Sequence, residues 1–149
     1  TKIIDEKVII TGLPGPKLTS VIELLRSRGF IVEGDPDKIN EIDSPLNNDI
    51  LAGFKQRICY LPENLIQNLL SKYDYRIVIV NDDVETVSDY LNSKTKLRKS
   101  SYNPDLIDGL VKMDITARIW LGQQPNLDIF YINELEDDKN ELLISFVKD

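Results

Sequence analysis

The sequence predicts an α/β domain with a mainly parallel, five-stranded sheet and helices on both faces. First, short apolar runs alternate along the chain with stretches whose apolar residues recur at helical spacing. Second, the run at 8–10 is continuously apolar, which is typical of strands buried on both faces. Third, 149 residues suit one compact domain with a sizeable core. Strands that alternate with helices imply βαβ crossovers, so we expect a single three-layer domain over residues 1–149.

The first half of the chain contains three predicted strands and one strongly amphipathic helix. The run Val-Ile-Ile at 8–10 is continuously apolar and predicts a buried strand. From 17 to 28 the apolar residues recur at helical spacing, and Gly29 is a suitable stop for that helix. The polar stretch farther along predicts a weak helix at 36–42, followed by a loop or a second short helix before Phe54. The second and third strands are expected at 30–33 and 57–61.

The second half continues the alternation. A helix should open at Pro62, because proline is favoured in the first turn of a helix. The run at 75–80 predicts the strongest strand, since β-branched residues dominate it. Residues 81–83 should cap the next helix, with carboxylates near its positive end. For the tail at 142–147 we favour a sixth, edge strand over a helix. The remaining expected elements are helices at 84–92 and 103–121 and a strand at 127–132.

Ligands of such folds bind beyond the carboxyl ends of the strands, beside the switch in strand order. We therefore expect four turns to lie together at one edge of the sheet. They are the turns at 12–17, 34–37, 61–63 and 81–83.

The composition excludes several classes of function. The chain has no histidine, which rules out Ser-His-Asp and Cys-His catalysis, histidine-bound metals and a histidine pH switch. Its one cysteine, Cys59, lies in an apolar run, where we expect a buried thiol. The formal charge of −7 argues against broad nucleic-acid binding. The sequence shows neither a run of membrane-spanning length nor a signal-peptide pattern, and we expect a soluble, cytoplasmic protein.

Residues 8–20 are the most informative segment, because an apolar run turns sharply through glycines and then enters a helical pattern. Strand, glycine-rich turn and helix together point backbone N–H groups and a helix amino end at a phosphate. The same segment is also compatible with a strand-to-helix turn that binds no ligand. The residues expected to bind a phosphate or nucleotide are Gly12, Gly15, Lys17, Thr19 and Ser20.

This segment resembles the phosphate-binding loop of nucleoside and nucleotide kinases of the P-loop NTPase superfamily. Their Walker A pattern, G-x-x-x-x-G-K-[ST], is matched at its first position by Gly12 and at its last by Thr19. However, Lys17 stands where the second glycine belongs, and Leu18 stands where the lysine belongs. A one-residue deletion in the alignment brings Lys17 near register but shortens the loop. The resemblance is therefore to a degenerate Walker A loop.

The resemblance extends over about residues 7–133, where the order of strands and helices is similar to that of these kinases. It implies the strand order 2-3-1-4-5, and it implies ATP and magnesium as cofactors. Three residues would take part in phosphoryl transfer: Lys17, Asp35 and Arg98. Two residues would lie beside magnesium: Thr19 and Asp82.

Each of these assignments has an ordinary structural alternative. Asp35, which would face the acceptor hydroxyl, is also a natural turn or helix-capping residue. Asp82 is compatible with a cap of the helix that follows it. The basic run at 93–101 resembles a kinase lid and contains Arg98, but it is also compatible with a solvated connection.

Two classes of function remain, besides an unrelated α/β fold. In the favoured class, the kinase-like scaffold is non-catalytic or weak and binds a nucleotide, a small phosphorylated ligand or a protein partner. In the alternative, it is a Mg-ATP-dependent phosphotransferase that acts on a nucleoside, a nucleotide or another small hydroxyl acceptor. The altered loop supports the first class, whereas the order of elements and the basic run support the second.

Overall fold

The computed structural model contains a five-stranded sheet in which every strand pair is parallel. The strand order is β2-β3-β1-β4-β5, which is the order that the kinase resemblance implies. The predicted α/β fold class, with a mainly parallel five-stranded sheet in the kinase-like order 2-3-1-4-5, is therefore confirmed. The structure describes residues 3–13, 15–34, 56–61, 73–98, 104–124, 128–133 and 137–148.

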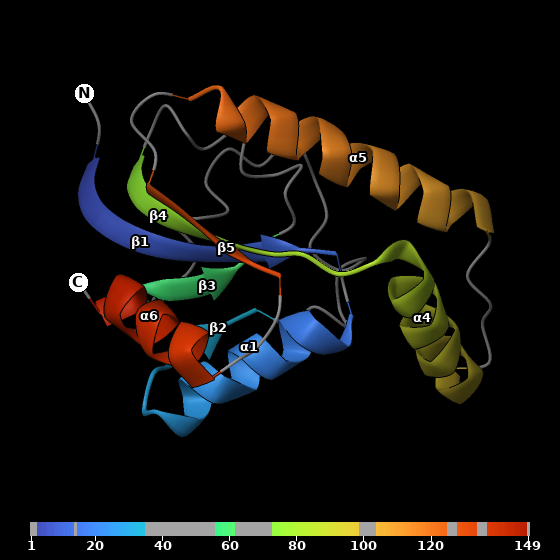
Figure 1. Ribbon diagram of the computed structural model, residues 1–149, viewed down its shortest axis with the longest axis horizontal. Helices are drawn as coiled ribbons and strands as arrows, with labels where there is room; N and C mark the ends of the chain where they lie inside the picture. The colour runs from blue at the N-terminus through green and yellow to red at the C-terminus, as the bar shows by residue number, and fades with distance from the viewer. Residues whose placement is uncertain are drawn as a thin grey trace.

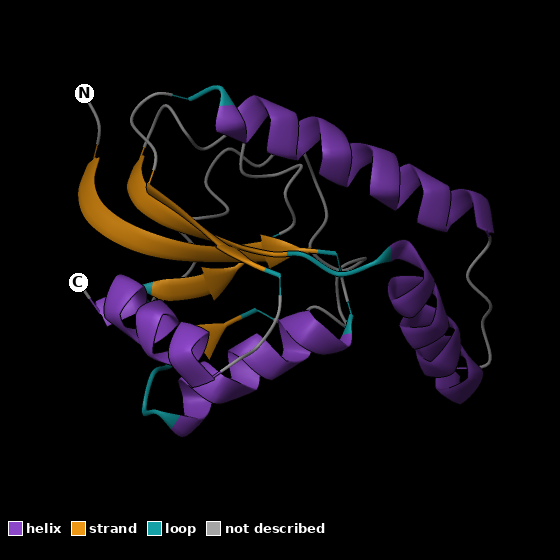
Figure 2. Ribbon diagram, viewed as in Figure 1, coloured by secondary structure: helices purple, strands orange, loops and turns teal. Residues whose placement is uncertain are grey.

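Helices cover both faces of the sheet. Figure 1 shows α1 and α6 on one face and α5 on the other, with α4 beyond the carboxyl ends of the strands. Figure 2 shows the same three layers by secondary structure. The strands are β1 (Ile3–Gly12), β2 (Val32–Glu33), β3 (Ile58–Tyr60), β4 (Tyr73–Val80) and β5 (Asp128–Ile132). The helices are α1 (Pro16–Ser27), α4 (Val84–Arg98), α5 (Pro104–Gly122) and α6 (Asp137–Lys148). Across these described helices, none is long and apolar enough to span a membrane.

The main core lies between the sheet and the pair formed by α1 and α6. Side chains of a strand alternate between faces, so every second residue of β1 and β4 points toward these helices. Those residues meet the apolar stripe of α1 and the buried side of α6. The buried residues of this core include Val8, Ile10, Leu18, Val21, Ile22, Leu25, Val78, Val80, Leu143 and Val147.

The side chains on the opposite face of β1 are also buried at the centre of the strand. Ile9 lies between Cys59 of β3 and Ile77 of β4, and all three side chains are fully buried. A central strand that is buried on both faces explains why the run at 8–10 is continuously apolar.

The expected edge strand at 142–147 is wrong, because this tail is part of the helix α6. Leu143 and Val147, four residues apart, are fully buried, whereas Leu142 is 59% exposed. A spacing of four residues belongs to one face of a helix. Lys148 in the last turn of α6 also complements the helix dipole.

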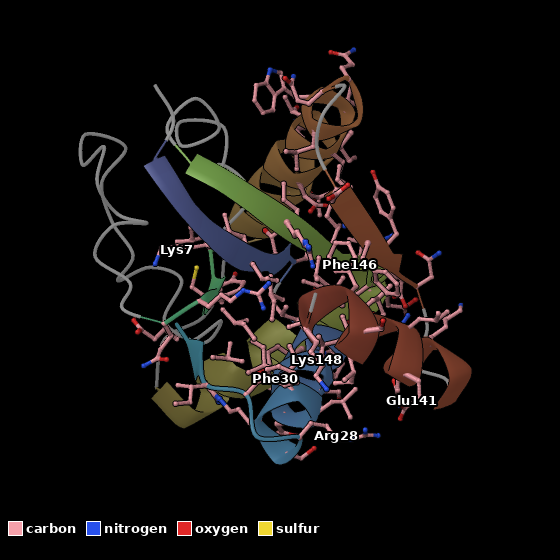
Figure 3. The ribbon with its side chains drawn as sticks, turned by 90° about the vertical axis from the view of Figure 1, so that its left-hand side faces the viewer. Lys7, Arg28, Phe30, Glu141, Phe146 and Lys148 are labelled. Atoms are coloured by element: carbon pink, nitrogen blue, oxygen red, sulfur yellow. The ribbon has the colours of Figure 1, made fainter. Side chains whose placement is uncertain are left out.

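Two arginines, one just before β3 and one in β4, bind the carboxyl end of α6. Arg57 donates to Val147 O, and Arg76 donates to Phe146 O at 2.8 Å. The guanidinium of Arg76 also lies over the Phe146 ring, 5.8 Å from its centre. Cations at the last carbonyls of a helix satisfy acceptors that lack helical partners. Figure 3 shows α6 beside α1 on this side of the sheet.

The other elements agree with the sequence in kind and differ in extent. Helix α4 runs to Arg98, so the first part of the basic run is helical rather than a connection. Strand β1 begins at Ile3, earlier than expected, and β2 is shorter than expected. The helices expected from Pro62 and at 36–42 lie outside the described residues.

Cys59 is a buried thiol, as its apolar surroundings predict. Burial raises the pKa of Cys59 to about 12, with Lys7 opposing the shift and Glu33 adding to it. Only the thiolate reacts readily, so at about pH 8 a disulfide reagent should label the native protein far more slowly than the chain unfolded in guanidinium chloride. The release of the reagent's chromophore measures both rates. Equal rates in the two states would contradict the buried position.

Candidate functional site

The carboxyl ends of the strands meet at one edge, as expected for a parallel sheet. Leu61, just after β3, donates its N–H to Ile10 O at 3.1 Å. Asn81, just after β4, donates its N–H to Ile132 O at 2.8 Å. Gly34, after β2, is so close to β3 that a Cβ there would lie 2.8 Å from Tyr60 O. The described parts of the four expected turns therefore lie along the same edge.

Gly12 ends β1 where the chain passes very close to β4. Its φ is +146°, and a Cβ at this position would lie 2.3 Å from Val80 O. Any other residue would meet the backbone of β4. Gly12 is therefore required by the packing of the turn, whether or not a ligand binds nearby.

Gly15 caps the amino end of α1 without a side chain of its own. A Cβ on Gly15 would lie 2.8 Å from Asp82 Oδ2. The backbone N–H of Lys17 donates to the same oxygen at 3.4 Å. The other oxygen, Asp82 Oδ1, accepts from the N–H of Asp83 at 3.1 Å. A carboxylate from the β4–α4 turn is thus placed at the positive end of α1.

Lys17 reaches across the same edge to the end of β5. Its ammonium Nζ donates to the backbone oxygen of Asn133 at 2.6 Å. The side chain of Asn133 accepts a second hydrogen bond, from Asn81 Nδ2 at 2.6 Å. Asn133 therefore joins the start of α1, the end of β4 and the end of β5.

Thr19 has its own partners, which differ from those of Asp82. Its hydroxyl donates to Gly15 O at 3.2 Å and lies 3.2 Å from the Tyr90 hydroxyl of α4. Ser20, the next residue of α1, is exposed. Within the described ranges, no group of three or more acidic, cysteine or histidine side chains is placed to hold a metal ion. Thr19 and Asp82, the two residues assigned to magnesium, therefore have different hydrogen-bond partners and do not form one site.

Asp83 caps α4. Its carboxylate accepts from the Thr86 N–H at 2.8 Å and from the Thr86 hydroxyl at 2.7 Å. These two hydrogen bonds, the backbone one first, lower the pKa of Asp83. The capping role expected for the segment at 81–83 is thus performed by Asp83, which leaves Asp82 free to face α1.

For Asp35 and Arg98, the other two residues assigned to phosphoryl transfer, the described structure gives no side-chain position. Asp35 lies outside the described residues, and so does the side chain of Arg98, which is the last residue of α4. Two further residues at the edge had no assigned role, Tyr90 and Asn133. Asn133 could have been found, because it directly follows a predicted strand and must end at the same edge. Nothing in the sequence indicates Tyr90.

Comparison with known proteins gives no family. No protein-family profile matches the chain, and no curated protein matches it. Among solved structures, an uncharacterized protein from Eubacterium ventriosum is similar with a TM-score of 0.47 at 10% identity, over 97% of this chain and 98% of that chain. A gluconokinase from Sinorhizobium meliloti is similar with a TM-score of 0.45 at 10% identity, over 99% of this chain and 90% of that chain. At these scores the strand order, rather than either neighbour, supports the fold assignment.

Proposed function

We propose that the chain is a kinase-like binding domain that does not transfer phosphoryl groups. The observation that carries the proposal is the 2.6 Å hydrogen bond from the Lys17 ammonium to Asn133 O. Phosphoryl transfer needs a cation close to the phosphates to neutralise the developing charge. Lys17 is the candidate cation of this turn, and its ammonium instead donates a hydrogen bond to the residue after β5.

The groups around the amino end of α1 do not fit Mg-ATP. A phosphate placed there would face the carboxylate of Asp82, whose Oδ2 already accepts the Lys17 N–H. The Thr19 hydroxyl, the candidate magnesium ligand, is held by Gly15 O and the Tyr90 hydroxyl. The proposed binding function therefore requires neither ATP nor magnesium at this position.

The ligand class that we propose is a protein partner. Ile115 and Ile119, four residues apart on α5, are 52% and 60% exposed. Residues at this spacing lie on one side of a helix, so these two exposed side chains offer a small apolar contact area to a partner. The competing function, a small-molecule phosphotransferase, is supported by the kinase-like strand order and by the position of α1 at the carboxyl edge.

The turnover of Mg-ATP tests the proposal. We expect the release of inorganic phosphate from Mg-ATP, Mg-GTP and Mg-dNTPs to stay at the level of the buffer, with candidate hydroxyl acceptors present or absent. The Lys17→Met variant is the matched control, because it removes only the ammonium. Turnover by the wild-type chain that this variant lowers by ~10-fold or more would contradict the proposal and establish the phosphotransferase.

A further inference from the structure

We infer that Asp82 is an internal anion of this fold, which takes the place of a phosphate at the amino end of α1 and closes that end to phosphate-bearing ligands. The inference rests on the proposed function, since both treat the domain as one that does not handle ATP at this turn. Beyond the proposed function, the inference names Asp82 as the group that excludes a phosphate. It also predicts that removing the charge of Asp82 restores phosphate binding.

The amino end of α1 has the properties that attract an anion. The first N–H groups of a helix have no helical acceptors, and the helix dipole places partial positive charge there. Gly15 supplies no capping side chain to this end. An acceptor must therefore come from elsewhere, from solvent, a ligand or another part of the chain.

That acceptor comes from a segment remote in sequence. Asp82 is 65 residues beyond Lys17, and its Oδ2 accepts the Lys17 N–H at 3.4 Å. The same oxygen lies 2.8 Å from the position of a Cβ on Gly15, so it sits directly against the turn. The Asp83 N–H on Oδ1 holds the carboxylate in this orientation.

A phosphate cannot share this position with the carboxylate. Both groups are anionic acceptors that would compete for the same N–H groups, and like charges at short range repel strongly. The Lys17 ammonium, the candidate cation of this turn, is directed toward the end of β5, where it donates to Asn133 O. Removing the charge of Asp82 should therefore create phosphate binding at α1, without any other change in the chain.

Thermal unfolding in sodium phosphate or pyrophosphate, against sodium chloride of equal ionic strength, tests the inference. The Tm of Asp82→Asn should rise by ~3–6 °C once phosphate reaches about ten times its Kd, and the wild-type Tm should not respond. Asp83→Asn is the matched control, because it removes one charge from the next residue, whose carboxylate contacts Thr86 rather than α1. It should behave as the wild type does.

A second variant and the amide resonance of Lys17 complete the test. Asp82→Ala should respond to phosphate as Asp82→Asn does, and it replaces that variant if the amide fails to fold. In either variant the amide resonance of Lys17 should shift on addition of phosphate, because its N–H exchanges one acceptor for another. Three results would overturn the inference: no response in either variant, a response of the wild-type chain, or an equal response of Asp83→Asn. None of these measures ATP turnover, so failure here is distinct from failure of the proposed function.

Discussion

Leu143→Ala should lower the free energy of unfolding by ~2–5 kcal/mol, because it empties a fully buried position in the main core. Leu143 lies on the inner side of α6, in the same buried cluster as the apolar residues of α1. Truncation removes contacts with that cluster and leaves a cavity that neighbouring side chains fill only in part. Urea unfolding followed by circular dichroism measures the loss.

Leu142→Ala is the matched control for this prediction. The residue type, the substitution and the helix are the same, but the Leu142 side chain is 59% exposed. Its truncation should change the free energy of unfolding by no more than ~0.5 kcal/mol. Equal losses at the two positions would show that the tail does not pack through one side of α6.

Gly12→Ala should lower the free energy of unfolding by ~3–5 kcal/mol, because it adds both backbone strain and a clash of the new Cβ with β4. The φ of +146° is unfavourable for alanine, and the added Cβ would lie 2.3 Å from Val80 O. Relief requires β1 to separate from β4 at its carboxyl end, in the middle of the sheet. Chemical unfolding of the two proteins under the same conditions measures the difference.

Gly29→Ala separates the two contributions at Gly12. Gly29 also has a positive φ, of +91°, but a Cβ there would meet no atom within 4 Å. Its substitution should therefore cost only the backbone term, ~1–2 kcal/mol. If Gly12→Ala costs no more than Gly29→Ala, the close approach of the turn to β4 is not as described.

Much of the sheet could be predicted because short patterns in the sequence indicate its individual strands. The run at 8–10 is continuously apolar because β1 is buried on both faces between two parallel neighbours. The helix α1 has both a stripe at helical spacing and a glycine stop, and it appears within one residue of its expected bounds. The strand order itself came from the resemblance to kinases, since periodicity does not say which strands are neighbours.

The tail shows where local patterns fail. The run Leu-Leu-Ile-Ser-Phe-Val at 142–147 has apolar residues at both strand and helical spacing, so its period does not decide between them. Packing against α1 decides it, through Leu143 and Val147 on one side of α6. The guanidinium groups of Arg57 and Arg76 then satisfy the last carbonyls of that helix. Both donors are remote in sequence from α6, so a local window does not contain them.

By itself, the sequence determined the class of fold and the turn at which a ligand site was to be sought, because apolar runs, helical stripes and glycines act over a few residues. Only the tertiary structure decided how that turn is used. Whether a phosphate or a carboxylate neutralises the start of α1 depends on Asp82, which is 65 residues beyond Lys17 and arrives with the end of β4. Whether Lys17 is available depends in the same way on Asn133, 116 residues beyond it. Contacts over such separations follow from strand order, since neighbouring parallel strands end at the same edge.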